Sequence, residues 1–263
     1  MNVFLDLFSG IGGFALGAYW AGLRFDKHYF SEIDDYAIQL YQKRFPNAIP
    51  LGDIRSIDYG KLPRGEYLVT GGFPCQPHSN AGLRKGKDDQ RDLWIECRRM
   101  LRDLRPTIAL FENVTGLFTS PGKERKGEFF NGILSDIHQS GYDAEWQVIS
   151  ARDVGAPHIR KRIFIVGFPK GRRLCGREIT TEAPSKTQRK TDCQEMRLWN
   201  GGAVCMGNRL YPKFEYARVG NGLSEELDTV RGIGNAVVPQ CVKIILSLPA
   251  FNRWRKERPQ EKL

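Results

Sequence analysis

The chain has 263 residues, of which 41% are hydrophobic, and it carries a formal charge of +10 with a sequence pI of about 9.4. This length suffices for one large domain with a full-sized core, and the basic charge favours a polyanionic partner such as nucleic acid. No apolar run approaches the ~18 residues that span a bilayer, and the first residues lack the basic and apolar stretches of a secretory signal, so we expect a cytoplasmic protein with no membrane partner.

Short apolar runs alternate with helical patterns along the first 168 residues. Strands are predicted at residues 3–7, 25–31, 67–70, 107–111, 142–149 and 163–168. Helices are predicted at residues 14–21, 36–45, 93–104 and 129–139. This alternation predicts an α/β fold, a doubly wound and mostly parallel sheet with helices on both faces. Ligands of such folds bind at the carboxyl ends of the strands.

The pattern changes near residue 168, where periodicity fades and Gly, Arg, Lys, Thr and Pro dominate. Residues 168–218 carry eleven Lys or Arg and five Asp or Glu, a net charge of +6 (11 − 5). We therefore expect a small, irregular, basic domain at residues 168–229. The large domain would comprise residues 1–167 together with residues 230–263.

Regular structure is expected to return near the C-terminus. Residues 236–248 are apolar and predict a helix, with Pro239 near its first turn, where proline is tolerated. Residues 253–263 are charged and predict a frayed tail.

The first predicted strand runs into a glycine-rich turn at residues 8–13. Its members are Phe8, Ser9, Gly10, Ile11, Gly12 and Gly13. Glycines here allow a ligand to approach the backbone closely, and they suit a dinucleotide, S-adenosylmethionine or simply tight packing. Glu32 follows the second strand, where an acid either accepts hydrogen bonds from ribose hydroxyls or is a surface carboxylate. Asp53 is either an acceptor for an adenine amino group or an ordinary turn residue.

Cys75 stands between Pro74 and Pro77 in a glycine-rich loop after the strand at residues 67–70. This setting predicts a rigid, partly exposed thiol rather than a buried structural one. Methylation of carbon 5 of a pyrimidine needs such a nucleophile, because a thiolate that adds to carbon 6 makes carbon 5 reactive toward a sulfonium methyl group. Cys75 is therefore the candidate nucleophile.

Two further segments carry candidate catalytic groups. Glu112 and Asn113 follow the strand predicted at residues 107–111, which lies beside the Cys75 loop in a doubly wound sheet. A protonated Glu112 in a water-poor pocket could donate to ring nitrogen 3, although an ion-paired surface acid fits the sequence as well. Arg160 and Arg162 are two residues apart on an extended segment, so both can point toward a pyrimidine carbonyl or a phosphate; a solvated basic face is the alternative.

The six cysteines and four histidines show no close ligand pairs. We therefore expect neither a bound metal nor a disulfide framework.

Taken in this order, the segments resemble the DNA (cytosine-5) methyltransferases of bacterial and phage type. Residues 6–13 resemble the first cofactor motif of that family, residues 72–77 its nucleophile loop, and residues 112–114 its catalytic acid motif. Residues 91–94 and residues 234–237 resemble two later motifs, while Arg160 and Arg162 match its paired arginines.

The resemblance implies a Rossmann-like, S-adenosylmethionine-dependent enzyme with a small target-recognition domain. It implies that double-stranded DNA is the substrate and that the target cytosine is flipped out of the duplex. The catalytic residues would be Cys75, Glu112, Asn113, Arg160 and Arg162. The S-adenosylmethionine site would comprise Phe8, Gly10, Ile11, Gly12, Gly13, Glu32, Ile33, Asp53, Ile54, Pro74, Leu93, Asn235 and Ala236. A monomer is the default, and a cognate restriction endonuclease is a further candidate partner through a restriction-modification system.

The chain departs from the family pattern at two places. Residues 208–228 hold only a shortened form of the arginine-rich motif that usually precedes the final segment, and His158 stands where the family often has glutamine. Three rival interpretations remain: a nicotinamide-dependent oxidoreductase, an RNA-methylating relative, and a DNA-binding module without activity. The first leaves Cys75 and the basic segment unexplained, and the second typically has proline where Phe73 stands.

Overall fold

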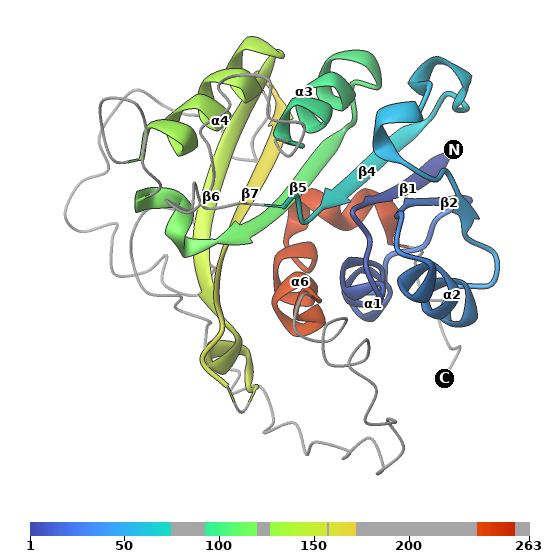
Figure 1. Cartoon of the computed structure of the whole chain (residues 1–263), viewed down its shortest axis with the longest axis horizontal. Helices are drawn as coiled ribbons and strands as arrows, with labels where there is room; N and C mark the ends of the chain where they lie inside the picture. Colours follow the sequence, from blue (N-terminus) through green and yellow to red (C-terminus); the bar gives the residue numbers. More distant parts are fainter. Residues whose placement is uncertain (75–92, 120–126, 157, 172–235, 256–263) are drawn as a thin grey trace, which may run out of the picture.

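The computed structural model describes residues 1–74, 93–119, 127–156, 158–171 and 236–255. In this part of the chain, seven strands form one sheet that has helices on both faces (Figure 1). The strands are β1 (Asn2–Leu7), β2 (Lys27–Ser31), β3 (Ile49–Pro50), β4 (Glu66–Gly71), β5 (Ile108–Val114), β6 (Tyr142–Ser150) and β7 (Lys161–Pro169). The α-helices are α1 (Gly13–Trp20), α2 (Asp35–Arg44), α3 (Trp94–Asp103), α4 (Glu128–Gln139) and α6 (Pro239–Leu246).

The strands lie in the order β3-β2-β1-β4-β5-β7-β6. The pairs β3–β2, β2–β1, β1–β4 and β4–β5 are parallel, whereas β7 runs antiparallel to both of its neighbours. The predicted doubly wound, mostly parallel sheet is therefore confirmed. The reversal of β7 follows from the short connection after β6, a 3-10 helix at Ala151–Val154 that is too short for a parallel crossover.

Apolar side chains are buried on both faces of the sheet. One cluster joins the sheet to α1, α2 and α6, and its largest members include Phe4, Phe14, Phe30 and Trp254. A second cluster joins the opposite face to α3 and α4. Because both faces are covered, the central strands are almost continuously apolar, as in β1, where Asp6 is the one polar residue among the buried residues 3–7.

Several predicted boundaries were wrong. Strand β5 continues through residues 112–114 because these residues pair with residues 162–164 of β7, so Glu112 and Asn113 lie within a strand and not after it. Lys161 and Arg162 likewise open β7 rather than preceding it.

The C-terminal tail was also predicted incorrectly at its beginning. The 3-10 helix η6 (Pro249–Trp254) follows α6, and the Trp254 side chain is fully buried. Its backbone carbonyl accepts a hydrogen bond from the Arg24 N–H at 2.7 Å, and Arg255 forms a β-bridge with Leu23. This segment is therefore held by the core.

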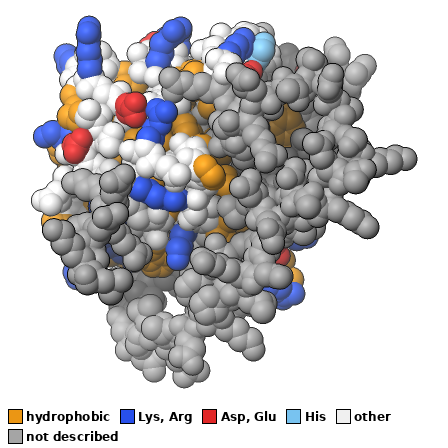
Figure 2. All heavy atoms as spheres, turned by 180° about the vertical axis from the view of Figure 1, so that it is seen from behind, with side chains coloured by type: hydrophobic (Ala, Val, Ile, Leu, Met, Phe, Trp, Pro, Cys, Tyr) orange, Lys and Arg blue, Asp and Glu red, His pale blue; other side chains and the backbone are white. Residues whose placement is uncertain are grey.

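The predicted small basic domain lies outside the described residues from residue 172 onward, whereas Phe168 and Pro169 belong to β7. Where the structure is described, no helix is both long and apolar enough to cross a bilayer. In the same part of the chain, no three His, Cys, Asp or Glu side chains are grouped as metal ligands, and Cys97 and Cys241 are buried thiols. On the face shown in Figure 2, the Lys and Arg side chains of the described residues are spread over several places.

Candidate functional site

The glycine-rich turn follows β1 and adopts a conformation that few residues tolerate. Gly10 and Gly12 have positive φ values of 49° and 89°, and Phe8 has a φ of 50° although it is not a glycine. A non-glycine residue in this region is strained, and such strain is concentrated at functional sites. The turn also holds the buried Ser9 hydroxyl, which has no hydrogen-bond partner among the described residues.

Glu32 ties this turn to the end of β2. Its Oε2 accepts a hydrogen bond from the Gly10 N–H at 2.7 Å, while its Oε1 accepts from the N–H groups of Ile33 at 2.8 Å and Asp34 at 3.1 Å. The neighbouring Ile33 side chain is 68% exposed. This pair of residues suits a nucleoside. The Glu32 carboxylate can accept hydrogen bonds from the sugar hydroxyls, and the exposed Ile33 side chain can pack against the base.

Helix α2 and the residue that follows it pack against the turn, a feature that the sequence analysis missed. The Arg44 guanidinium donates to the Ile11 carbonyl at 2.8 Å. A Cβ atom on Gly12 would lie 2.7 Å from the Phe45 ring and 3.3 Å from that of Tyr41, so only glycine fits there. The i, i+3, i+4 spacing of Tyr41, Arg44 and Phe45 was the available signal, since it places them on one face of the predicted helix.

Helix α6 approaches the same turn from the C-terminal part of the chain. A Cβ atom on Gly13 would collide with the Val237 carbonyl oxygen and lie 3.2 Å from the Val237 Cβ. The predicted cofactor residue Ala236 is adjacent to Val237, whereas Asn235 lies outside the described residues. The structure thus brings Val237, and with it the neighbouring Ala236, to the turn.

The remaining predicted cofactor residues have varied surroundings. Asp53 accepts from the Arg55 backbone N–H at 3.0 Å and forms an ion pair with the Arg55 side chain, which holds the pKa of Asp53 below its usual value. Ile54 has a buried side chain, so any ligand contact is made by its backbone. Leu93 is partly buried at the start of α3. The Asp53 carboxylate is therefore already paired with Arg55 in this structure.

The candidate nucleophile loop leaves the sheet after β4. Phe73 is buried against the rings of Trp94 and Phe111, while the next residue, Pro74, is exposed. The Asn113 side-chain amide donates to the Phe73 carbonyl at 3.1 Å and so anchors the start of the loop. Cys75 lies outside the described residues.

Glu112 lies next to this anchored segment. It is 8% exposed, and its Oε2 would be 3.5 Å from a Cβ atom on Gly72. Burial raises the pKa of Glu112, although Arg162 and Arg160 act in the opposite direction. The carboxyl group therefore favours a proton more strongly than a solvated glutamate does.

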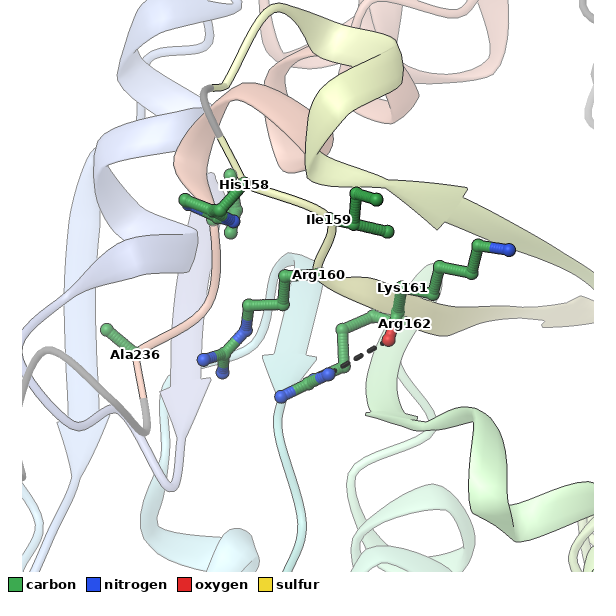
Figure 3. Close-up of a pocket in the computed structure, with 7 residues that line it drawn as sticks. His158, Ile159, Arg160, Lys161, Arg162 and Ala236 are labelled. Carbon is green, nitrogen blue, oxygen red and sulfur yellow. Dashed lines mark hydrogen bonds between the residues drawn. The ribbon is translucent and has the colours of Figure 1, made fainter.

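The paired arginines lie beside Glu112. Nε of Arg162 is 2.9 Å from Oε1 of Glu112. Arg160 and Arg162 extend to the same side of the segment, while Lys161 points away from them (Figure 3). These residues line an open hollow of about 460 Å³, together with His158, Ile159, Ala236 and Val238. A hollow of this size is within the ordinary range for small-molecule sites and would admit a single base.

The described groups therefore meet at one edge of the sheet. The turn after β1, Glu32 after β2, Phe73 after β4 and Glu112 near the end of β5 all lie at the carboxyl ends of parallel strands. Antiparallel β7 begins at this edge, because Arg162 pairs with Val114. A nucleoside-type site thus adjoins a buried acid and two arginines.

Comparison with known families agrees with this arrangement. The family model described as "C-5 cytosine-specific DNA methylase" matches residues 3–202. The chain belongs to this family. The RNA-methylating and oxidoreductase interpretations are thereby less favoured than the DNA methylase interpretation.

Curated members of the methylase family resemble the chain over much of its length. Type II methyltransferase M1.ScrFI of Lactococcus lactis subsp. cremoris is 39% identical over 71% of this chain and 46% of its own length. Type II methyltransferase M.NlaX of Neisseria lactamica is 41% identical over 62% of this chain and 51% of its own. The chain therefore spans about half the length of these relatives.

A solved structure supports the fold. A variant of Spodoptera frugiperda DNMT2 matches with a TM-score of 0.56 at 20% identity, over 69% of this chain and 54% of that one. At this identity, the likeness shows the shared fold alone.

Proposed function

We propose that the chain is a DNA cytosine-5 methyltransferase, which transfers a methyl group from S-adenosylmethionine to carbon 5 of a cytosine flipped out of duplex DNA. The observation that carries the proposal is the placement of Glu112: it is buried, its pKa is raised by that burial, it lies against Gly72 of the nucleophile loop, and it contacts Arg162. Family membership supports the same activity.

The turn after β1 fits S-adenosylmethionine. The positive φ values of Gly10 and Gly12 open the backbone to a ligand, and Glu32 presents a carboxylate for ribose hydroxyls. The Ser9 hydroxyl, which bonds to no group in the described part of the chain, can bond to a bound molecule. When bound, this cofactor supplies the electrophilic methyl group. Phe8, Gly10, Ile11, Gly12, Gly13, Glu32, Ile33, Asp53, Ile54, Pro74, Leu93, Asn235 and Ala236 would form its site.

Four side chains would act on the base. The Cys75 thiolate adds to carbon 6, and the protonated Glu112 donates to ring nitrogen 3, which stabilises the negative charge that develops on the ring. Arg162, held against Glu112, and Arg160 bind the pyrimidine carbonyl and an adjacent phosphate. Asn113 keeps Phe73, and with it the start of the Cys75 loop, in place. After methylation, carbon 5 loses its proton and Cys75 leaves carbon 6, which restores the aromatic ring.

Duplex DNA would be held between the large domain (residues 1–167 and 230–263) and a small target-recognition domain (residues 168–229), whose net positive charge suits phosphates. We further propose that the protein acts as a monomer at the nucleoid, in the bacterial cytoplasm. A cognate restriction endonuclease would be a functional partner, because the resembling proteins are named Type II methyltransferases.

Bisulfite sequencing of a plasmid from cells that express the chain tests this proposal. We expect protected cytosines in one short sequence context, and none when Cys75→Ser is expressed at an equal level, because a serine hydroxyl does not add to carbon 6. Undiminished protection by Cys75→Ser would refute the mechanism. DNA that carries 5-fluorocytosine should form a cofactor-dependent covalent adduct, since fluorine cannot leave as a cation.

Labelled cofactor separates the substrate classes. Purified chain is incubated with it and with either duplex DNA or tRNA, and we expect label in the duplex alone. Label in tRNA alone would overturn the choice of DNA, and label in neither would favour a DNA-binding module without activity.

A further inference from the structure

A line of hydrogen bonds runs through the core beneath the glycine-rich turn. The Tyr19 hydroxyl lies 3.2 Å from Nδ1 of His28, and Nε2 of His28 lies 2.8 Å from the Tyr41 hydroxyl. The Tyr41 hydroxyl donates to Oδ2 of Asp6 at 3.0 Å, and the Thr70 hydroxyl donates to Oδ1 at 2.7 Å. Five side chains from α1, β2, α2, β1 and β4 are thus connected, and no motif of the sequence analysis included Tyr19, His28, Tyr41 or Thr70.

The geometry fixes the direction of each bond in this line. When Asp6 is ionised its carboxylate only accepts, so the Tyr41 hydroxyl donates to Asp6, and the Tyr41 oxygen then accepts from Nε2–H of His28. Burial lowers the pKa of His28 to about 4, so the ring is neutral and has one donor and one acceptor. Nδ1 therefore accepts from the Tyr19 hydroxyl. All three bonds point toward Asp6, an arrangement in which each bond polarises the next.

Asp6 is the point at which this line reaches the proposed cofactor site. It lies in β1 two residues before Phe8, where the turn begins, and it is fully buried. The backbone N–H of Ala15, in the first turn of α1, also bonds to its carboxylate. Thr70 adds a bond from β4, just before the candidate nucleophile loop. The Asp6 carboxylate therefore joins the elements on both sides of the turn.

We propose that His28 and Tyr41 are positioning residues for cofactor binding: His28, as the Nε2–H tautomer, holds the Tyr41 hydroxyl as a donor to Asp6, and this sets the turn at residues 8–13 relative to α1 and β4. The proposal rests on the proposed function, because it assigns S-adenosylmethionine to that turn. Neither side chain touches the ligand; both act through Asp6 and through the ring contacts of α2 with Gly12.

The alternative is that His28 merely fills space. Its ring packs 4.9 Å from that of Phe4, 5.5 Å from that of Phe45 and 5.7 Å from that of Tyr41. A packing role and a hydrogen-bonding role predict different outcomes for two substitutions. His28→Phe keeps an aromatic ring and removes the donor, whereas His28→Gln loses the ring but carries an amide N–H at the position of Nε2.

Calorimetry with S-adenosylmethionine at pH 8, where Asp6 is ionised, tests the proposal on the full chain. Loss of one buried hydrogen bond corresponds to about a fivefold change in affinity. We expect His28→Phe and Tyr41→Phe each to weaken cofactor binding about fivefold or more, and the double variant to be no weaker than Tyr41→Phe alone, because the two act in series. We expect His28→Gln to bind within about twofold of the wild type and Tyr19→Phe to have the smallest effect.

Steady-state kinetics and NMR provide the remaining readouts. The KM for the cofactor should rise in His28→Phe while kcat at saturation is kept, and ¹⁵N shifts of the wild type at pH 8, where Asp6 is ionised, should show Nε2 protonated and Nδ1 unprotonated. A protonated Nδ1, additive effects in the double variant, or wild-type affinity in His28→Phe would overturn the proposal. If the wild type does not bind S-adenosylmethionine, both the proposed function of this turn and the positioning role are refuted. If the variants bind S-adenosylmethionine more weakly as expected but the wild type does not methylate DNA, the proposed function is refuted and the positioning role is supported.

Discussion

Gly17 is the position at which helix propensity and packing predict opposite effects. It lies inside α1 and faces α6, and a Cβ atom there would be 2.5 Å from Val242 Cβ and 2.7 Å from the Pro239 carbonyl oxygen. Ordinary contact begins at 3.4 Å, so α6 would have to move by about 0.9 Å (3.4 − 2.5). Alanine is the better helix former by about 1 kcal/mol, but overpacking costs about 1–3 kcal/mol, and the Pro239 oxygen is backbone and cannot rotate away. We expect Gly17→Ala to lower the free energy of unfolding by about 1 kcal/mol.

Gly132 supplies the matched control for this substitution. It lies inside α4, is exposed, and would have no atom within 4 Å of an added Cβ. Gly132→Ala should therefore stabilise the protein by about 0.5–1 kcal/mol, and the two variants should differ by about 2 kcal/mol in urea denaturation at equal m-values. If Gly17→Ala stabilised the chain as much as Gly132→Ala does, the close contact between α1 and α6 would be refuted.

Three further predictions concern the site. Burial raises the pKa of Asp6 from 3.8 to about 7, so between these pH values the native state binds a proton that the unfolded chain does not. The free energy of unfolding should therefore fall by roughly 4 kcal/mol as the pH rises from 3.8 to 7. In denaturation experiments across that range, Asp6→Asn should remove most of this pH dependence. Asn113→Ala leaves the buried Phe73 carbonyl without its donor, which costs about 1–3 kcal/mol, and should abolish methylation while calorimetry still detects cofactor binding; unchanged methylation would contradict the anchoring role. DNA affinity should fall linearly in log–log plots against salt concentration, and a flat plot in a filter-binding assay would argue against phosphate contacts.

The sheet and the edge that carries the site could be predicted from the sequence, because apolar runs and helical periods alternate clearly. The strands β1, β2 and β4 lie within a few residues of their predicted positions, and their carboxyl ends bring the glycine turn, Glu32 and Phe73 together. The motif resemblance located Glu112 and Arg162, whose side chains are 2.9 Å apart. The local sequence was sufficient wherever a single residue type, such as glycine in the turn, or a single hydrophobic periodicity determines the backbone conformation.

Features that depend on tertiary pairing could not be predicted. The last three residues of β5 are a strand only because β7 pairs with them, and the polar pair Glu112 and Asn113 gave no strand signal. Trp254 lies in a charged segment, so composition predicted a frayed tail, yet its ring is fully buried. The support of the turn by Arg44, and the line from Tyr19 to Asp6, arise from side chains far apart in sequence.

The antiparallel direction of β7 explains how a sheet of this kind can serve a cofactor and a base at the same edge. In an all-parallel sheet, the residues that open a strand lie at its amino-terminal edge, away from the loops after β1 and β4. Here β6 ends at the carboxyl edge and the chain turns back through Ala151–Val154, so the first residues of β7 lie beside the last residues of β5. Arg162 therefore reaches Glu112, and Arg160 reaches the hollow next to Ala236. Ala236 is held there because the next residue, Val237, packs against Gly13 and α6 packs against Gly17, so the proposed base site depends on a segment from the other end of the chain.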